Sequence, residues 1–123
     1  MASVISPHQE AHRKAVEASL TDLVRTLVEA LGRSLVAVLA GGVDPKTVKR
    51  WLEGQKPRSE AEARLRLAFQ VFQLLLSRES EHTVRAWFIG LNPQLNDVSP
   101  AEAIREGNLR DVLVAAKSFT LGG

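Results

Sequence analysis

Basic side chains are concentrated in one short part of this chain. Seven lysines and arginines lie between positions 46 and 66, against three glutamates, so this segment carries a net charge of +4 while the whole chain carries +2. Long cationic side chains bind phosphate groups with an affinity that falls steeply as salt is added. The segment therefore predicts a contact with DNA, and the polar residues expected to make it are Lys46, Thr47, Lys49, Arg50, Lys56 and Arg58.

The spacing of apolar residues within this segment predicts a short helix with its basic side chains facing outward. Val48 and Trp51 are three positions apart, so they share one face of a helix. Asp44 is a favourable N-cap, and Pro45 suits the first helical position, where its missing N–H is not needed. Gly54 is expected to end the helix.

A second apolar helix is predicted immediately before it, with a glycine pair between the two. Leu35 and Leu39 belong to that helix, and Gly41 and Gly42 can adopt the positive φ of a sharp corner. Two helices joined in this way form the helix-turn-helix that places its second helix in the major groove of DNA. An ordinary α-hairpin with a solvated basic face fits the same pattern, but the local charge excess favours DNA binding.

The elements around this motif also have helical periodicity. The apolar residues from Leu20 to Leu31 repeat with helical spacing and stop at Gly32, whereas the start of the chain is expected to be frayed. Ser59 and Glu62 form a capping-box pattern that opens a long helix at roughly 60–77. This helix is apolar most of the way round. Its second apolar stripe is predicted to form a homodimer interface, with burial inside the monomer as the alternative, and consists of Leu67, Val71 and Leu74.

The composition of the chain changes after position 78. A short helix that carries Trp87 and Phe88 is predicted at 82–90, and Asn92 and Pro93 are expected to form a turn after it. The aromatic pair is interpreted as a support for this unit.

A second capping signal lies further along the chain. Ser99, Pro100 and Glu102 supply an N-cap, a proline at the first position and an acid in the first turn of a helix that ends at Gly107. A last helix is predicted at 108–118. Because no apolar alternation of useful length occurs, the fold is expected to be all-α.

Several other classes of site are disfavoured by the composition. The chain has no cysteine, so disulfides and thiolate metal sites are excluded. His8 and His12 form an i, i+4 pair, but no third ligand is apparent, so both are interpreted as exposed and no metal or cofactor is expected. No residues have the pattern of a catalytic site. The N-terminus has no apolar signal core and the longest apolar run is too short for a bilayer, so we expect a cytoplasmic protein with no membrane contact.

The C-terminal part resembles the toxin-binding domain of Xre/MbcA/ParS-type antitoxins, and the part before it resembles their Xre-like helix-turn-helix. The resemblance covers about Ser34 to Phe119. It departs from the family pattern at Leu95–Val98, where a Leu-Gly-Gly type of turn is common. The residues that match are Trp87, Asn92, Pro93, Pro100, Glu106, Gly107 and Val112 to Val114.

This resemblance implies a DNA-binding and dimerisation region at 1–78 and a toxin-binding domain at 79–123. It further implies a homodimeric antitoxin that inhibits a RES-domain, NAD-degrading toxin from an adjacent gene and represses its own operon by binding operator DNA. The C-terminal tail is implied to block the toxin's active site, although a frayed end without a role is the alternative. The implied toxin-binding residues are Trp87, Asn92, Pro100, Lys117, Ser118, Phe119, Thr120, Leu121, Gly122 and Gly123. A free-standing dimeric transcriptional or partition regulator without a toxin partner is the competing interpretation.

Overall fold

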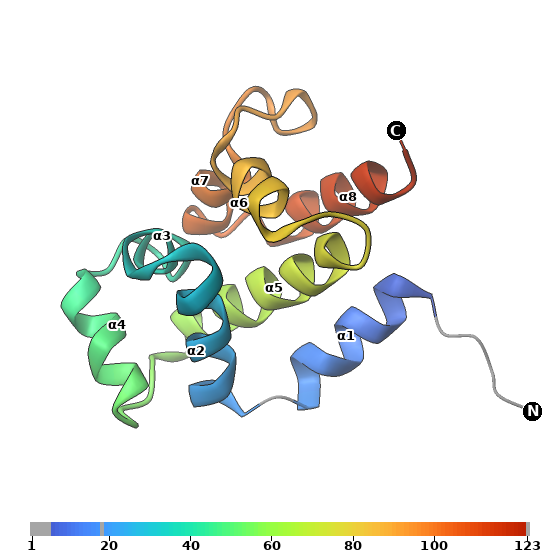
Figure 1. Cartoon of the computed structure of the whole chain (residues 1–123). Helices are drawn as coiled ribbons and strands as arrows, with labels where there is room; N and C mark the ends of the chain where they lie inside the picture. Colours follow the sequence, from blue (N-terminus) through green and yellow to red (C-terminus); the bar gives the residue numbers. More distant parts are fainter. Residues whose placement is uncertain (1–5, 18, 123) are drawn as a thin grey trace, which may run out of the picture.

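A computed structural model describes residues 6–17 and 19–122, and every regular element in these two ranges is helical (Figure 1). The all-α prediction is therefore confirmed. In this part of the chain no helix combines the length and the apolar character needed to cross a bilayer. The elements are α1 (Pro7–Glu17), α2 (Leu20–Leu31), α3 (Arg33–Leu39), α4 (Pro45–Leu52), α5 (Ser59–Leu76), α6 (Glu81–Ile89), the 3₁₀ turn η1 (Pro93–Leu95), α7 (Pro100–Arg105) and α8 (Leu109–Thr120).

Helix α5 is the central element of the fold. It runs through the middle of the molecule, and α1, α2 and α8 all pack against it (Figure 1). Leu65, Phe72 and Leu75 on this helix are completely or almost completely buried. One hydrophobic core includes residues from all eight described α-helices. The segments 1–78 and 79–123 therefore meet in a common core, with the turn between α5 and α6 at their boundary.

The central position of α5 contradicts the predicted dimer stripe. Val71 is 0% exposed and Leu74 is 1% exposed within this single chain, and Leu67 is half-buried against the same core. Because neighbouring helices cover α5 on several sides, these side chains have little or no surface left for a second copy. The assignment of Val71 and Leu74 to a homodimer interface is wrong because both are buried within the monomer, whereas the half-buried Leu67 stays a prediction.

Two of the predicted helix starts are confirmed, and one is not. The Lys46 N–H donates to Asp44 Oδ1 over 2.8 Å, and the Glu102 N–H donates to Ser99 Oγ over 3.1 Å. Helix α5, in contrast, begins at Ser59 itself and has no side-chain cap. The predicted capping box is wrong because the chain turns helical one residue earlier and Glu62 pairs with Arg66 over 2.9 Å.

The frayed start is a second correction, since α1 is a helix of 11 residues packed on α5. A capping box opens it. The Gln9 N–H donates to Ser6 Oγ and the Ser6 N–H donates to Gln9 Oε1, each over 3.1 Å. Ala11 is 1% exposed, so the helix buries at least one side chain in the core. The sequence signal was Ser6-Pro7 with Gln9, which follows the same pattern as Ser99-Pro100 with Glu102.

Candidate functional site

The predicted corner between α3 and α4 is formed by the glycine pair. Gly41 and Gly42 have φ values of 116° and 85°, a region that side chains other than glycine rarely adopt. The N–H groups of Gly42 and Val43 both donate to the Ala37 carbonyl oxygen, over 3.0 and 3.1 Å. Val43 packs partly buried against the core. These contacts hold the start of α4 close to the end of α3.

Helix α4 has one buried face and one basic face, as its spacing predicts. Val48 is 0% exposed and Trp51 is 4% exposed, so these two side chains attach the helix to the core. The outward side chains include those of Lys49 and Arg50, which are exposed, whereas Thr47 is half-buried. The exposed cations of α4 and of the loop that follows it are Lys46, Lys49, Arg50, Lys56 and Arg58.

These five cations are not neutralised by a carboxylate within the part of the chain that the structure describes. Among residues 6–17 and 19–122, none of them takes part in an ion pair. Their charge is therefore available to an external anion, and the arrangement on and after one helix suits a polyanion such as a nucleic-acid backbone.

A second candidate site lies in the C-terminal part of the chain. Trp87, Asn92 and Phe119 come from α6, the loop after it and α8, and all three line one pocket of about 280 Å³. The Trp87 ring meets the Phe88 ring edge-on at 5.5 Å and the Phe119 ring at 6.4 Å. The structure thus brings together three of the residues that were expected to bind a partner protein.

Large apolar side chains are exposed in the same part of the molecule. Ile89 is 49% exposed, Leu91 77%, Val114 53% and Leu121 83%, and no other large apolar residue of the described chain is comparably exposed. Sequence analysis missed Ile89, Leu91 and Val114. Ile89 and Val114 lie outside the buried stripes of their helices, as Val114 does two residues after the buried Val112, whereas Leu91 lies in the loop after α6 and has no such signal.

The loop between η1 and α7 keeps a left-handed turn without glycine. Asn96 and Asp97 have φ values of 57° and 64°, a conformation that asparagine and aspartate tolerate better than most residues. Asn92 and Val98 pair across the base of this loop, and Asn92 Oδ1 accepts from the Gln94 N–H over 2.9 Å. The Asn92 side chain therefore holds the loop in place as well as lining the pocket.

Comparison of the chain with family models, curated proteins and solved structures finds no match. The resemblance to the antitoxin family therefore stays a prediction carried by the sequence motifs.

The structure corrects the extent of the predicted tail, because the last helix continues two residues beyond its predicted end at position 118. Lys117, Ser118 and Phe119 belong to α8, which continues through Thr120. Thr120 is 9% exposed and its carbonyl oxygen accepts from Arg78 Nη1 over 2.7 Å. This bond and the contact of Phe119 with Trp87 keep the segment folded. Beyond the helix, Leu121 and Gly122 are exposed, and Gly123 lies outside the described residues.

Pro100 is a further correction among the predicted toxin-binding residues. It is buried at the first position of α7, where its ring starts the helix. A partner protein has no direct access to it, so its role is to position α7.

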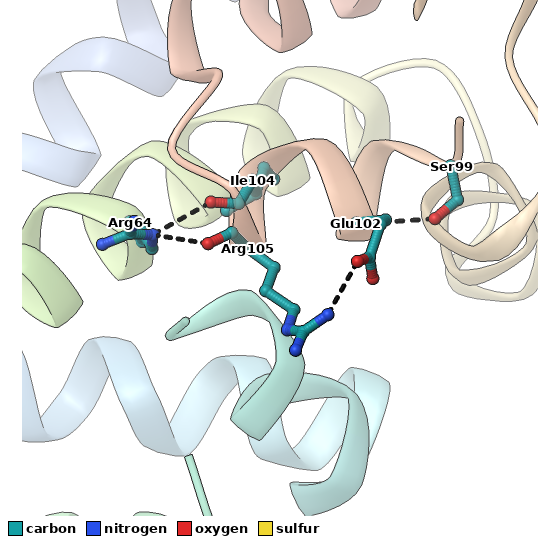
Figure 2. Close-up of polar contacts among 5 residues, drawn as sticks. All are labelled: Arg64, Ser99, Glu102, Ile104 and Arg105. Carbon is teal, nitrogen blue, oxygen red and sulfur yellow. Dashed lines mark hydrogen bonds and ion pairs between the residues drawn. The ribbon is translucent and has the colours of Figure 1, made fainter. Parts of the chain in front are cut away.

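Two arginines lie where helix α7 meets α5 and the corner between α3 and α4, and Figure 2 shows their bonds. Arg64 of α5 donates from Nε to the carbonyl oxygens of Ile104 and Arg105, each over 3.1 Å. Arg105 pairs with Glu102 over 2.7 Å, and its guanidinium lies so close to Gly42 that a Cβ there would be 2.7 Å from Nε. The C-terminal part is therefore held directly against the corner that begins α4.

The histidines are placed differently from each other. His12 is exposed, as predicted, but His8 is half-buried and its Nδ1 atom is buried. Within residues 6–17 and 19–122, no three histidine, aspartate or glutamate side chains are grouped in a way that could hold a metal ion.

Proposed function

We propose that this chain is an antitoxin that binds operator DNA through α4 and inhibits a RES-domain, NAD-degrading toxin through its C-terminal part. The DNA-binding part of this proposal is supported by the two faces of α4, one buried and apolar and the other exposed and basic. Val48 and Trp51 are buried, while Lys46, Lys49 and Arg50 are exposed and unpaired among the described residues. The toxin-binding half rests on the family resemblance together with the exposed apolar surface.

In the proposed DNA complex, the outward face of α4 enters the major groove. The N-terminal residues of a recognition helix contact base edges, so Lys46, Thr47, Lys49 and Arg50 are assigned to this role. Lys56 and Arg58 follow the helix in an exposed loop and are assigned to phosphate contacts. Binding at the chain's own promoter would repress the operon.

In the proposed toxin complex, the partner contacts the pocket lined by Trp87, Asn92 and Phe119. It also contacts the exposed side chain of Leu91. Contiguous apolar surface with aromatic walls is typical of protein interfaces. Because α8 is helical through Thr120, the blocking element is the end of this helix with Leu121, rather than a flexible tail.

The homodimer also remains part of the proposal, because a two-fold operator is read by two copies of a helix-turn-helix. Since Val71 and Leu74 are buried, the second copy has to bind another surface. Sedimentation equilibrium of the purified chain would establish its oligomeric state.

The toxin-binding half is tested with the purified product of the adjacent gene and a titration of this chain. We expect NAD consumption to stop at a fixed molar ratio. Leu91→Asp is expected to weaken inhibition by about tenfold or more, because a charge is then buried in the interface. Ala63→Asp adds the same charge at an exposed position of α5 and serves as the control.

A regulator that binds DNA without a toxin partner is the alternative function. The exposed basic face of α4 supports it equally, because DNA binding requires no toxin. If the adjacent product consumes no NAD, or consumes it regardless of this chain, the antitoxin proposal is wrong. A dimeric helix-turn-helix regulator without a toxin partner then remains, and binding to its own promoter region is the decisive measurement.

A further inference from the structure

A pocket of about 270 Å³ lies between the start of α1, the end of α5 and the end of α8. It shares no lining residue with the pocket at Trp87 and contains none of the α4 cations. The residues that line it are Ser6, Pro7, His8, Leu74, Arg78, Lys117, Thr120 and Leu121.

The polar lining of this pocket is basic. His8, Arg78 and Lys117 come from three separate segments, and no carboxylate is present among the lining residues. Arg78 donates from Nη1 to the Thr120 carbonyl oxygen over 2.7 Å, which uses one nitrogen of the guanidinium and leaves donors for another acceptor. In the described part of the chain, neither Arg78 nor Lys117 has an ion-pair partner. The pocket therefore concentrates positive charge that no carboxylate of the described residues neutralises.

His8 adds an unsatisfied polar atom. Its Nδ1 is buried and makes no hydrogen bond within residues 6–17 and 19–122. Burial, then the charge of Lys117, then His12 lower the pKa of His8 below its usual range, which favours the neutral imidazole. Burying a polar atom without a partner costs free energy, so the His8 ring beside the pocket is incompletely satisfied.

The remaining walls of the pocket are apolar. Pro7, Leu74 and Leu121 supply them, and Leu121 is 83% exposed at the end of α8. The N-terminus of α1 also lies here, and the positive end of its helix dipole favours an anion. A basic end and an apolar wall in one small pocket suit a ligand that has both characters.

We propose that this pocket binds a small organic anion, with its carboxylate or phosphate group held by Arg78 and Lys117 and a short apolar body against Pro7, Leu74 and Leu121. The bound anion connects α1 to the end of α8 and neutralises the charge of the cluster. Lys117, Thr120 and Leu121 also belong to the C-terminal segment that is proposed to block the toxin. Anion binding is nevertheless a property of this chain alone, so the site does not depend on the proposed antitoxin function.

The test uses benzoate and phenyl phosphate as probes and benzamide as the neutral control. Binding is followed by calorimetry and by the imidazole resonances of His8. We expect the two anions to bind, benzamide not to bind, and the His8 resonances to move on binding. The comparison of benzoate with phenyl phosphate identifies the preferred head group.

Two variants sharpen the test. Lys117→Met is expected to weaken anion binding by about tenfold, because one hydrogen-bonded charge is removed. Arg33→Met removes a cation from an exposed position at the start of α3, to which no binding role is assigned, and affinity should stay unchanged. Circular dichroism establishes that both variants are folded.

Three results would overturn the proposal. The first is the absence of heat and of any movement of the His8 resonances with wild-type protein at anion concentrations up to about 1 mM, which lies at the weak end of specific binding. The second is equal affinity for benzamide. The third is unchanged affinity in a folded Lys117→Met variant. Neither DNA binding nor NAD consumption is measured, so failure here is separate from failure of the proposed antitoxin function.

Discussion

Individual side chains on α4 have separate tasks. Val48 and Trp51 attach the helix to the core, and Lys49 and Arg50 are exposed on the outside. The exposed pair can therefore be changed without disturbing the buried pair. This separation makes the DNA-binding proposal testable at two residues.

The double variant Lys49→Glu with Arg50→Glu is expected to abolish operator binding. Because two cations near the DNA are lost, the slope of log affinity against log salt should also become less steep for any residual binding. Fluorescence anisotropy with a labelled fragment of the chain's own promoter, repeated at several salt concentrations, measures both quantities.

The matched control is Arg25→Glu with Arg85→Glu, which changes the net charge equally at exposed positions on α2 and α6. We expect its DNA affinity to stay close to that of the wild type apart from a small general effect of charge. Strong, salt-sensitive binding by the α4 variant would contradict the assignment of the recognition helix.

At the scale of elements, the same local signal starts three helices. Ser6-Pro7, Asp44-Pro45 and Ser99-Pro100 each place a capping side chain before a proline at the first helical position. Such caps act through backbone N–H groups two or three residues away, so they can be recognised without knowledge of the fold. The packing of the helices depends instead on long-range contacts such as those of Arg64.

Arg64→Gln is expected to destabilise the protein because α7 loses its attachment to α5. The guanidinium is partly buried and donates to two carbonyl oxygens at the end of α7. Loss of hydrogen bonds from a charged donor predicts a free energy of unfolding that is lower by about 1.5–3 kcal/mol. Urea denaturation followed by circular dichroism measures this change.

Arg25→Gln is the control for the loss of stability expected in Arg64→Gln. Arg25 pairs with Asp22 over 2.9 Å, but the pair is exposed, so its removal should cost about 0–1 kcal/mol. If both variants lose the same stability, the Arg64 contacts do not hold α7 as described.

At the scale of the whole molecule, the segments 1–78 and 79–123 share one hydrophobic core. Helix α5 packs against α1 and α2, which belong to segment 1–78, and against α8, which belongs to segment 79–123. Helix α3 also contacts α7. A protein built in this way is expected to unfold as one cooperative unit.

A fragment that ends at Arg78 is therefore expected not to form the native fold as a monomer. It lacks α6, α7 and α8, and the face of α5 that α8 covers would be left in water. Thermal unfolding by circular dichroism and the dispersion of amide resonances compare the fragment with the whole chain. A sharp cooperative transition and well-dispersed resonances in the fragment would show that 1–78 is an independent domain.

The features that could be derived from the sequence are local ones. The helical class, the caps at Asp44 and Ser99, the glycine corner and the basic face of α4 depend on residues only a few positions apart. Backbone preferences and helical periodicity act over that range, so the amino-acid sequence alone is sufficient to predict these features.

Other features depend on which surfaces meet in the folded chain. An apolar stripe has the same pattern whether its own chain or a partner covers it, so only packing places Val71 and Leu74 in the core. The last two residues of α8 lie beyond the predicted end of that helix at position 118, and there the Thr120 carbonyl oxygen accepts from Arg78, which is 42 positions away in the sequence. The grouping of His8 with Arg78 and Lys117 joins residues distant in sequence, and no local rule acts over that separation.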